Sequence, residues 1–429
     1  MRRAVVVALV LLAPSTGGSS PAHTCRAIPV SQRPVRYAHA STLQQAVAAA
    51  TPCDWIIVAP GTYRGPLTIR TPDVHLRGLD RNTVVLDGGH RVGNGIVVDA
   101  NGVSVENMTV RDFDRRSRND DDTGTQIAWR GVDGWSGRYL TVYDDGLLGG
   151  YGVWAARSTR GRLDRVFASG FDDSGLYVGA CRNCRTVVSD SVAERNLIGL
   201  AATNAGGRFV VRDSLFEDNA VGASFNSSLS DPPPPQRGTC TAAPTITTTR
   251  LARCTVFRDN RVLDNDAVHV PAETSSLRPG VGIGIDLLGS IGDLVTANVF
   301  ADNRNIGVLG LQLPVSGHTR FPLAGDRISG NTISGSRLAL ALAGGAGSVD
   351  DCVEIAVGAT EPADLAPYSC RQATTPALPA GATARVVVLV RRLHAQAVAA
   401  LGVPQPRPRP LPTMPRPCLG VPPTPVCAG

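Results

Sequence analysis

A glycine followed by three apolar or small residues recurs through the middle of the chain at a nearly constant interval. Intervals of 23, 24 and 23 residues separate the first four of these glycines, and a 23-residue interval separates two more after a longer gap. The six motifs begin at Gly152, Gly175, Gly199, Gly222, Gly284 and Gly307. A constant interval of this size indicates a structural repeat, and the apolar triplets predict one short β-strand in each unit.

A second β-rich segment and a short polar turn precede each of these strands. Examples are "LDRVFASGFDDSG", "VVSDSVAERNLIG", "VVRDSLFEDNAVG" and "LVTANVFADNRNIG". Two or three short strands per unit, with no helix between them, exclude a parallel sheet with helical crossovers. They predict an all-β solenoid whose strands stack about 4.8 Å apart along its axis. We expect nine or ten coils between residues 54 and 350, with an insertion at 226–280, in a rod about 45 Å long.

Amphipathic segments flank the repeat on both sides. Residues 23–53 end in a predicted helix, with Ser41 as its N-cap and an apolar face made of Leu43, Ala46, Val47 and Ala50. A cysteine-bearing connector at 351–383 precedes a second predicted helix at 384–402, with a stripe made of Val386, Val390, Leu393, Ala397 and Leu401. We expect each helix to cover an open edge of the coil. Residues 403–429 form a proline-rich tail that we expect to be extended or loosely attached.

The first 22 residues have the order of a secretory signal peptide. Arg2 and Arg3 precede an apolar run, and small residues lead to a cleavage site after Ala22. The apolar run is too short to span a bilayer. We therefore predict a secreted product, extracellular or associated with the cell wall, and not a membrane-spanning protein; a lipoprotein acylated at Cys25 is the weaker alternative.

Composition narrows the function classes. All 42 basic residues are arginine, so the absence of lysine excludes Schiff-base catalysis and a lysine general base. The net charge of +6 is small and its arginines are spread along the chain, which does not favour nucleic acid as a partner. We expect a monomer.

Ten cysteines in an exported chain predict five disulfides. Pairing between sequence neighbours is the simplest hypothesis, and it gives Cys25–Cys53, Cys181–Cys184, Cys240–Cys254, Cys352–Cys370 and Cys418–Cys427. The Cys-x-x-Cys spacing of Cys181 and Cys184 is also compatible with a redox or metal site. However, no thioredoxin-like βαβ pattern and no second Cys-x-x-Cys accompany it.

Two pairs of adjacent carboxylates are the candidate catalytic groups. Cleavage of a glycosidic bond commonly uses two acids. The pairs are Asp144 with Asp145 and Asp172 with Asp173, and Arg130 is a candidate assistant. Both pairs fall at the polar corner that precedes a glycine-led strand, so successive coils bring them near each other. The structural alternative is that such corners are polar in every coil.

Aromatic residues concentrate in the same region. Residues 129–177 hold nine of the twenty aromatic residues of the chain. Aromatic faces beside carboxylates are typical of sugar-binding grooves. The candidate ligand-binding residues are Trp129, Trp135, Tyr143, Trp154 and Tyr177. The alternative is that these rings fill the interior of the longest coils.

No cofactor is required by any motif. The acidic stretch "NDDDTG" at 119–124 has oxygen ligands for calcium, but it lacks the spacing of known calcium loops. A solvated acidic loop is the alternative.

The stretch "STLQQAVAAATPCDWIIVAPGTYRGPLTI" followed by the repeats resembles the right-handed parallel β-helix proteins of the pectin-lyase-like superfamily. The resemblance covers residues 41–345. Within it, "NAGG", "DPPPPQRGTC" and "CRNC" are similar to segments of secreted actinobacterial β-helix proteins of unassigned role. The resemblance implies the fold, but the same coil carries lyases, hydrolases, epimerases, adhesins and scaffolds.

Of the catalytic patterns found in that superfamily, this chain shows only the Asp-Asp pairs. We therefore expect a protein that binds an extracellular or cell-wall polysaccharide, or that acts as an envelope scaffold. The alternative function is that of a lyase or glycoside hydrolase on acidic glycans. In that case the four aspartates serve as acid, base or calcium ligands.

Overall fold

The fold was obtained as a computed structural model. It describes residues 25, 28–39, 41–117, 120, 122–146, 148–228, 255–266, 280–314, 320–345, 348, 351–354, 358–372, 374–378, 385–390, 392 and 405–427. The proposed signal peptide, residues 1–22, lies outside this set.

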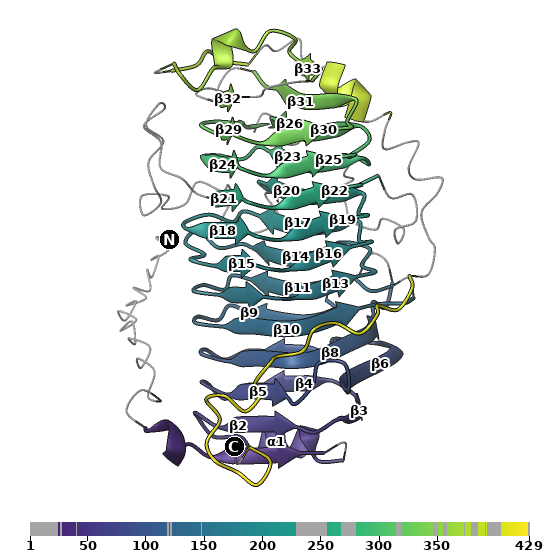
Figure 1. The fold of residues 1–429 in the computed structure, drawn as a ribbon, viewed down its shortest axis with the longest axis vertical. Helices are drawn as coiled ribbons and strands as arrows, with labels where there is room; N and C mark the ends of the chain where they lie inside the picture. Colours follow the sequence, from purple (N-terminus) through teal and green to yellow (C-terminus); the bar gives the residue numbers. More distant parts are fainter. Residues whose placement is uncertain are drawn as a thin grey trace, which may run out of the picture.

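Three ladders of parallel strands, called sheets I, II and III below, wind the chain into a long coil (Figure 1); sheets I and II share their longest strands and so form one 20-stranded sheet. Sheet I contains β1 (Val35–Ala38), β2 (Trp55–Val58), β5 (His75–Gly78), β8 (Ser104–Asp114), β10 (Ser136–Tyr143), β12 (Arg162–Asp164), β15 (Val187–Ser189), β18 (Phe209–Arg212), β21 (Thr255–Arg258), β24 (Asp293–Thr296), β29 (Arg327–Ser329) and β32 (Cys352–Glu354). Sheet II contains β3 (Gly61–Arg64), β6 (Val84–Val92), the second halves of β8 and β10, β13 (Phe167–Ser169), β16 (Val192–Glu194), β19 (Leu215–Glu217), β22 (Arg261–Leu263), β25 (Val299–Ala301) and β30 (Thr332–Ser334).

Sheet III contains the six glycine-led strands and five others. They are β4 (Leu67–Ile69), β7 (Ile96–Val98), β9 (Thr125–Arg130), β11 (Tyr151–Ala156), β14 (Ser174–Gly179), β17 (Ile198–Thr203), β20 (Val221–Asn226), β23 (Ile283–Leu288), β26 (Ile306–Leu311), β31 (Leu338–Ala343) and β33 (Thr360–Glu361). All pairings within the three sheets are parallel, and equivalent positions of successive coils stack, as Val153 does on Leu176. The fold is a right-handed parallel β-helix, as the repeat and the resemblance predict. Ten of the eleven described strands of sheet III lie within residues 54–350, where nine or ten coils are expected; the eleventh, β33, lies beyond that range.

The corners between the sheets explain the recurring polar residues. At the corner between sheets I and II, one residue of each coil adopts a left-handed conformation, for example Arg165 at φ 56° and Asp190 at φ 52°. The corner between sheets II and III repeats this at Arg195 and Asp218, with φ of 57° and 54°. The residue after this position is often an asparagine that bonds to its counterpart in the next coil. These side chains form the buried ladder Asn196, Asn219, Asn265 and Asn303. The polar corners are therefore required by the fold itself.

The interior of the coil is apolar and aromatic. Phe257 lies between Phe216 and Phe300 along the axis, with ring centroids 5.7 and 6.5 Å away. Trp129 and Trp135 meet in the same interior at 4.9 Å, and both are buried. Alternate residues of each strand therefore form one continuous core.

The first predicted helix is present, with one correction. Helix α1 (Leu43–Ala48) lies at the purple end of the coil in Figure 1, and it buries Leu43 and Val47 in the core. Its N-cap is Thr42 and not Ser41, because the helix begins at Leu43 and the Ala46 N–H donates its hydrogen bond to the Thr42 carbonyl. A short 3-10 turn (Val30–Gln32) precedes β1.

At the opposite end, helical turns at 385–390 represent the second predicted helix. Val386 is buried in the same hydrophobic cluster as Ile306 and Leu309 on the outer face of sheet III. The described turns therefore pack beside the coil, and residues 393–402 lie outside the described set.

Two segment boundaries differ from those expected. The predicted insertion at 226–280 contains β21 and β22, which pair with β18 and β19, so the coil continues through its middle. The rest of that segment, 229–254 and 267–279, lies outside the described residues. The connector at 351–383 also carries coil strands β32 and β33, followed by a 3-10 turn (Ala366–Tyr368). A two-stranded antiparallel ribbon, β27 (Leu313–Pro314) with β28 (Arg320–Phe321), leaves the coil between β26 and β29.

The C-terminal tail, residues 405–427, is extended and closely attached. In Figure 1 it runs in yellow from the level of β13 across β10, β8 and β5 toward the end that carries α1. The Arg77 guanidinium donates to the carbonyls of Pro417 and Leu419 at 2.9 and 2.8 Å. Val421 and Cys427 pack in one cluster with Trp55 and Ile57 of β2. The tail is thus part of the folded structure.

Four of the five expected disulfides are formed. They are Cys25–Cys53, Cys181–Cys184, Cys352–Cys370 and Cys418–Cys427. Cys240 and Cys254 lie outside the described residues. No free cysteine occurs in the described part, and four disulfides favour an oxidising compartment. No helix in the described part is long and apolar enough to cross a membrane.

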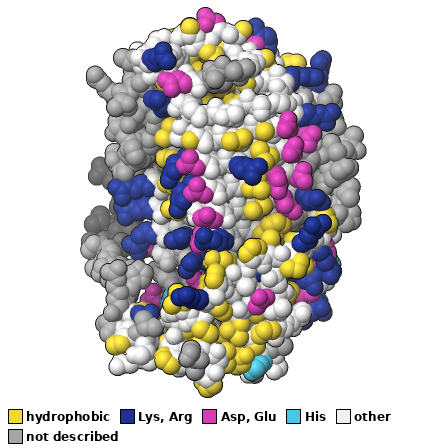
Figure 2. Space-filling model, in the orientation of Figure 1, with side chains coloured by type: hydrophobic (Ala, Val, Ile, Leu, Met, Phe, Trp, Pro, Cys, Tyr) yellow, Lys and Arg dark blue, Asp and Glu magenta, His cyan; other side chains and the backbone are white. Residues whose placement is uncertain are grey.

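Figure 2 shows the face crossed by the tail. Arginine and acidic side chains are interspersed there, with hydrophobic side chains between them. This face therefore carries charges of both signs close together.

Candidate functional site

Four aspartates and one histidine meet at the corner between sheets II and III. We name this group the corner cluster: His90, Asp112, Asp114, Asp144 and Asp145. The register between β6 and β8 shifts between Asp87 and Arg91, so three residues of β6 oppose one of β8. Such a bulge turns a side chain away from the regular ladder. Here it places His90, at φ 57°, beside the ends of β8 and β10.

The imidazole of His90 joins acids from two later coils. Its Nε2 lies 2.9 Å from Asp145 Oδ1, and its Nδ1 lies 3.3 Å from Asp114 Oδ1. The Asp145 backbone N–H donates to Asp112 Oδ1 at 3.2 Å, and the Gly146 N–H donates to Asp144 Oδ1 at 2.8 Å. Ligand atoms of His90, Asp112 and Asp145 lie within 4.8 Å of one another, as do those of His90, Asp114 and Asp144.

Burial and neighbouring charges raise the pKa of some groups in the cluster and lower that of others. Asp144 has no exposed surface, so burial, together with the charges of Asp114 and Asp112, holds its pKa well above the usual range. Burial also acts on Asp145, but its contacts with Arg407 and His90 outweigh burial and lower its pKa. For His90, burial is outweighed by the surrounding aspartates, which raise its pKa. The cluster thus holds one carboxyl whose pKa is raised beside another whose pKa is lowered.

Two arginines balance the charge of the cluster. Arg111 donates to Asp112 Oδ2 at 3.0 Å and to Asp87 Oδ2 at 2.7 Å. Arg407 of the tail donates from Nε to Asp145 Oδ2 at 2.6 Å. The C-terminal tail therefore contacts the group of residues that β6, β8 and β10 bring together.

The second predicted acid pair surrounds a buried arginine. Arg115 has no exposed surface, and its guanidinium lies 3.3 Å from Asp172 Oδ1 and 3.8 Å from Asp173 Oδ2. The Tyr151 hydroxyl donates to Asp173 Oδ2 at 2.9 Å, and the guanidinium lies 5.2 Å from the Tyr151 ring. Asp172 and Asp173 thus compensate an internal charge in this conformation. Because Asp172 is fully buried, it has no surface for a substrate.

The candidate aromatic residues divide into two groups. Trp129 and Trp135 have essentially no exposed surface inside the coil, so they cannot contact a ligand there. Tyr143 is also buried, with the Arg111 guanidinium 5.7 Å from its ring. Trp154, which is half-buried, and Tyr177, which is buried, belong to the outer face of sheet III, where their rings stack with centroids 6.0 Å apart.

Tyr151, half-buried on the same face, meets Tyr177 edge-on at 5.7 Å. We name Tyr151, Trp154 and Tyr177 the aromatic column. Arg130 lies exposed at the far end of β9, on the opposite edge of sheet III from the corner cluster.

Another titratable group lies farther along the outer face of sheet III. Ser224 and Asp286 occupy the same outward position as Trp154 and Tyr177 in later coils. Asp286 is buried, and desolvation raises its pKa to about 7 despite a contact with the Ser224 hydroxyl. No described residue donates a hydrogen bond to Asp286 Oδ1.

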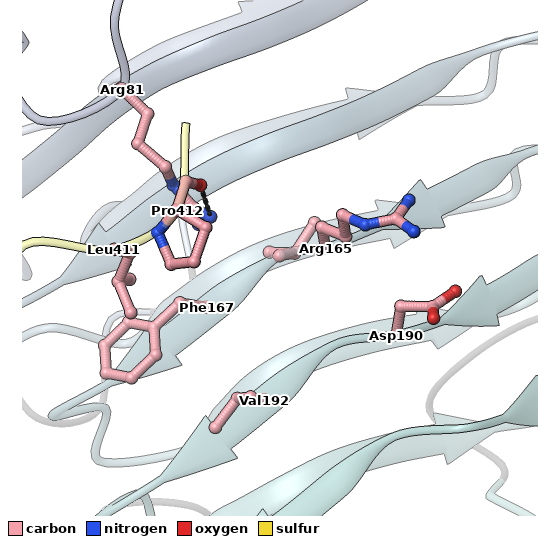
Figure 3. Close-up of a pocket in the computed structure, with 8 residues that line it drawn as sticks. Arg81, Arg165, Phe167, Asp190, Val192, Leu411 and Pro412 are labelled. Atoms are coloured by element: carbon pink, nitrogen blue, oxygen red, sulfur yellow. Dashed lines mark hydrogen bonds between the residues drawn. The ribbon is translucent and has the colours of Figure 1, made fainter. Parts of the chain in front are cut away.

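A hollow opens where the tail crosses the corner between sheets I and II (Figure 3). It encloses about 290 Å³ between Phe167 and Val192 of sheet II and Leu411 and Pro412 of the tail. Arg81 donates to the Pro412 carbonyl at 3.2 Å on one side. Arg165 and Asp190 project on the other side, to the right in the view.

The site residues that the sequence reasoning missed are His90, Asp112, Asp114, Tyr151, Asp286 and Arg407. The Asp112–Asp114 spacing of two puts both side chains on one side of a strand, which is a usable signal. The bulge in β6 places His90, and a contact between residues 262 positions apart places Arg407, so neither residue has a local sequence signal.

The acidic stretch at 119–124, considered above as a calcium loop, forms a turn with internal hydrogen bonds. Asp120 accepts from the Thr123 hydroxyl and from the Asp122 backbone N–H. Asn119 and Asp121 lie outside the described residues.

No protein-family model matches the chain, and no curated protein is significantly similar to it in sequence. Several solved structures share the fold. A mannuronic-acid-specific polysaccharide lyase from human gut microbiota has 12% identity and a TM-score of 0.45, over 75% of this chain and 77% of that one. An exopolygalacturonase from Thermotoga maritima has 8% identity and a TM-score of 0.44, over 75% and 86%. The A-module of a mannuronan C-5 epimerase from Azotobacter vinelandii has 15% identity and a TM-score of 0.39, over 71% and 87%. At these identities the likeness concerns the fold alone.

Proposed function

We propose that this protein is secreted and binds an extracellular or cell-wall polysaccharide along the outer face of sheet III. The observation that carries the proposal is the aromatic column. Tyr151 and Trp154 are half-buried, so each retains ring surface at the exterior of the coil. Sugar rings present apolar C–H faces that pack on such aromatic surfaces, while their hydroxyls bond to nearby polar groups.

The geometry of the column suits an extended polymer. Trp154 and Tyr177 lie directly opposite each other on β11 and β14, with an angle of 22° between their ring planes. Because the strands of successive coils are about 4.8 Å apart, a linear chain lying along the axis contacts several coils at once. The contact between the Tyr151 hydroxyl and Asp173 fixes one ring before any ligand arrives. A rigid platform loses little conformational entropy on binding.

The test is glycan binding by the Trp154→Ala variant. On a panel of uronate-containing and neutral polysaccharides, the wild type binds at least one polymer, and Trp154→Ala lowers the affinity about tenfold or more, as expected for loss of one stacking contact. Tyr37→Ala is the matched control, because Tyr37 is an exposed aromatic residue on β1 at the end of the coil. Equal binding by the wild type and Trp154→Ala would exclude this face. Absence of binding to every polymer would leave the envelope-scaffold role as the better hypothesis.

Cleavage of an acidic polysaccharide is the second candidate function. The opposed pKa shifts of Asp144 and Asp145 favour it, because glycan cleavage commonly uses two carboxyl groups, one that holds its proton more readily than the other. Asp144 is buried and Asp145 is bonded to Arg407, so a substrate reaches them only if the tail moves away. Release of oligosaccharides by the wild type, abolished in Asp145→Asn, would support this function over binding alone.

A further inference from the structure

We propose that the hollow beside the tail binds a small organic carboxylate with an apolar ring, and that the Arg81 guanidinium receives its carboxylate group. This inference is independent of the polysaccharide-binding face, because the hollow lies at the corner between sheets I and II and not on sheet III.

Arg81 is a buried arginine that has no carboxylate partner among the described residues. It is 3% exposed, and Arg77 and Arg115 are buried as well. Arg77 lies 2.6 Å from Glu106, and Arg115 lies 3.3 Å from Asp172. No described carboxylate forms an ion pair with Arg81. A buried charge without a counter-charge costs free energy, so an anion that reaches Arg81 is stabilised there.

The Arg81 guanidinium also retains hydrogen-bonding capacity. Its Nε donates to the Thr141 hydroxyl at 3.0 Å, Nη1 donates to the Pro412 carbonyl at 3.2 Å, and Nη2 donates to the Leu140 carbonyl. These three acceptors are neutral, and a guanidinium has five N–H donors in all. Burial lowers the pKa of Arg81 to about 10, which still leaves the group charged at neutral pH. A charged group with two further N–H donors therefore lines the hollow.

The size and walls of the hollow indicate the body of the ligand. Its volume of about 290 Å³ suits a single ring, since sites for larger small molecules extend to about 1,000 Å³. Phe167 and Val192 form one wall, and Leu411 and Pro412 form the other. In Figure 3 the Arg81 side chain points toward Pro412, and the Phe167 ring lies below it. A ring between the two walls therefore has Arg81 at one end.

The charge of the lining suits an anion that carries one negative charge. Arg165, the other arginine of the lining, already bonds to Asp164 at 3.1 Å. Asp190 is exposed and adds a negative charge to the lining. A single uncompensated guanidinium matches one carboxylate better than a phosphate group, which carries nearly two charges at neutral pH.

The apolar walls favour a hydrocarbon ring over a sugar ring. A hexuronate also combines a ring with a carboxylate, but it has hydroxyl groups around the ring. The side chains of Phe167, Val192, Leu411 and Pro412 offer these hydroxyls no hydrogen bonds, and burying a hydroxyl without a partner costs free energy. An aromatic carboxylate is therefore the better fit.

The test is titration of the full-length protein with sodium benzoate, benzamide and sodium glucuronate, followed by ligand-observed NMR. The wild type is expected to bind benzoate at least tenfold more tightly than benzamide, which has the same ring and no charge. Glucuronate, which has the charge and a polar ring, should also bind at least tenfold more weakly than benzoate. These comparisons need no substitution, so they test the charge and the walls without disturbing the fold.

Val192→Phe should abolish benzoate binding, because the added ring fills the hollow. Leu215→Phe is the matched control, since Leu215 pairs with Val192 in the next coil and lies outside the lining. Arg81→Met should weaken benzoate binding tenfold or more and leave benzamide binding unchanged. Circular dichroism and the melting temperature verify that each variant is folded.

The proposal is overturned if the wild type binds no benzoate, or binds benzoate and benzamide with equal affinity. It is also overturned if Val192→Phe and Leu215→Phe bind benzoate alike, because the ligand then lies elsewhere. Tighter binding of glucuronate than of benzoate would equally contradict it, since the hollow would then accept a sugar ring.

Discussion

Asn219 donates from Nδ2 to Oδ1 of Asn265, 46 residues later, at a distance of 3.0 Å. Asn265 in turn donates to Oδ1 of Asn303 at 2.9 Å and to the Phe216 carbonyl at 2.9 Å. Each side chain therefore satisfies polar groups of both neighbouring coils inside a dry corner. The ladder ties successive coils together where their backbones turn.

Asn265→Ala should destabilise the protein by roughly 2–3 kcal/mol. The substitution leaves buried groups of Asn219 and Phe216 without a partner, and each such group costs about 1–3 kcal/mol. Urea unfolding followed by circular dichroism measures the change. Asp266→Ala, one residue away and outside the ladder, should stay within about 0.5 kcal/mol of the wild type. Equal effects of the two substitutions would mean that the ladder does not contribute to stability.

Arg115→Met should destabilise the protein more than the small change in side-chain volume alone would. Arg115 has no exposed surface and faces Asp172 and Asp173, so its removal leaves buried negative charge uncompensated, at a cost of about 3–5 kcal/mol. Arg116→Met changes the adjacent residue, whose side chain is 74% exposed, and should have little effect. The midpoint of chemical denaturation distinguishes them. Combining Arg115→Met with Asp172→Asn should recover part of the loss; a purely additive double variant would contradict the charge argument.

Removal of the tail should weaken the end of the coil that carries α1. The tail supplies carbonyl acceptors to Arg77 and Arg81, and it covers Trp55 with Val421 and Cys427. Hydrogen bonds to charged groups contribute about 1.5–3 kcal/mol each, so a protein ending at residue 404 should lose roughly 3 kcal/mol or more. Tryptophan fluorescence during urea unfolding reports the change, because Trp55 becomes exposed. An unchanged midpoint and an unchanged initial spectrum would show that the docked tail is not stabilising.

The coil could be predicted from the sequence because it is encoded locally and repeatedly. A fixed interval of about 23 residues, apolar triplets and polar corners specify the same turn many times over, and every repeat reinforces the inference. The asparagine ladder is visible in the same way, as Asn196, Asn219 and Asn265 each close a strand segment. The docking of the tail has no such signal, because its contacts join residues more than 250 positions apart.

The candidate site was only partly predictable because one register position decides which aromatic rings face outward. Trp129 pairs with Ala155, whereas Trp154 pairs with Ala128. The two tryptophans are therefore one step out of register, and one enters the core while the other remains outside. Local sequence does not reveal this offset, since both residues lie in apolar strands of similar composition. Asp145 was identified, but its partners His90 and Arg407 required the bulge in β6 and the docked tail.

The stability of the protein should fall as the pH rises from about 4 to 7, because of Asp286. Burial raises the pKa of Asp286 to about 7, whereas the unfolded chain ionises this carboxyl near 3.8. Between these values the folded state holds a proton that the unfolded state has lost, so the free energy of unfolding decreases with pH. The decrease is on the order of 4 kcal/mol and ends above the folded pKa, since both states are then ionised.

Asp286→Asn removes this dependence because the amide does not titrate. The variant should be close to the wild type in stability near pH 4 and more stable near pH 8, where the wild type holds a charged group in a dry site. Urea unfolding at half-unit steps from pH 4 to 8 measures both curves. Asp302→Asn, an exposed acid at a corner of the coil, is the control for the change in net charge and should run parallel to the wild type. If the Asp286→Asn curve is also parallel to the wild type, Asp286 is not protonated in the folded protein, and water or another polar group must reach it on the outer face of sheet III.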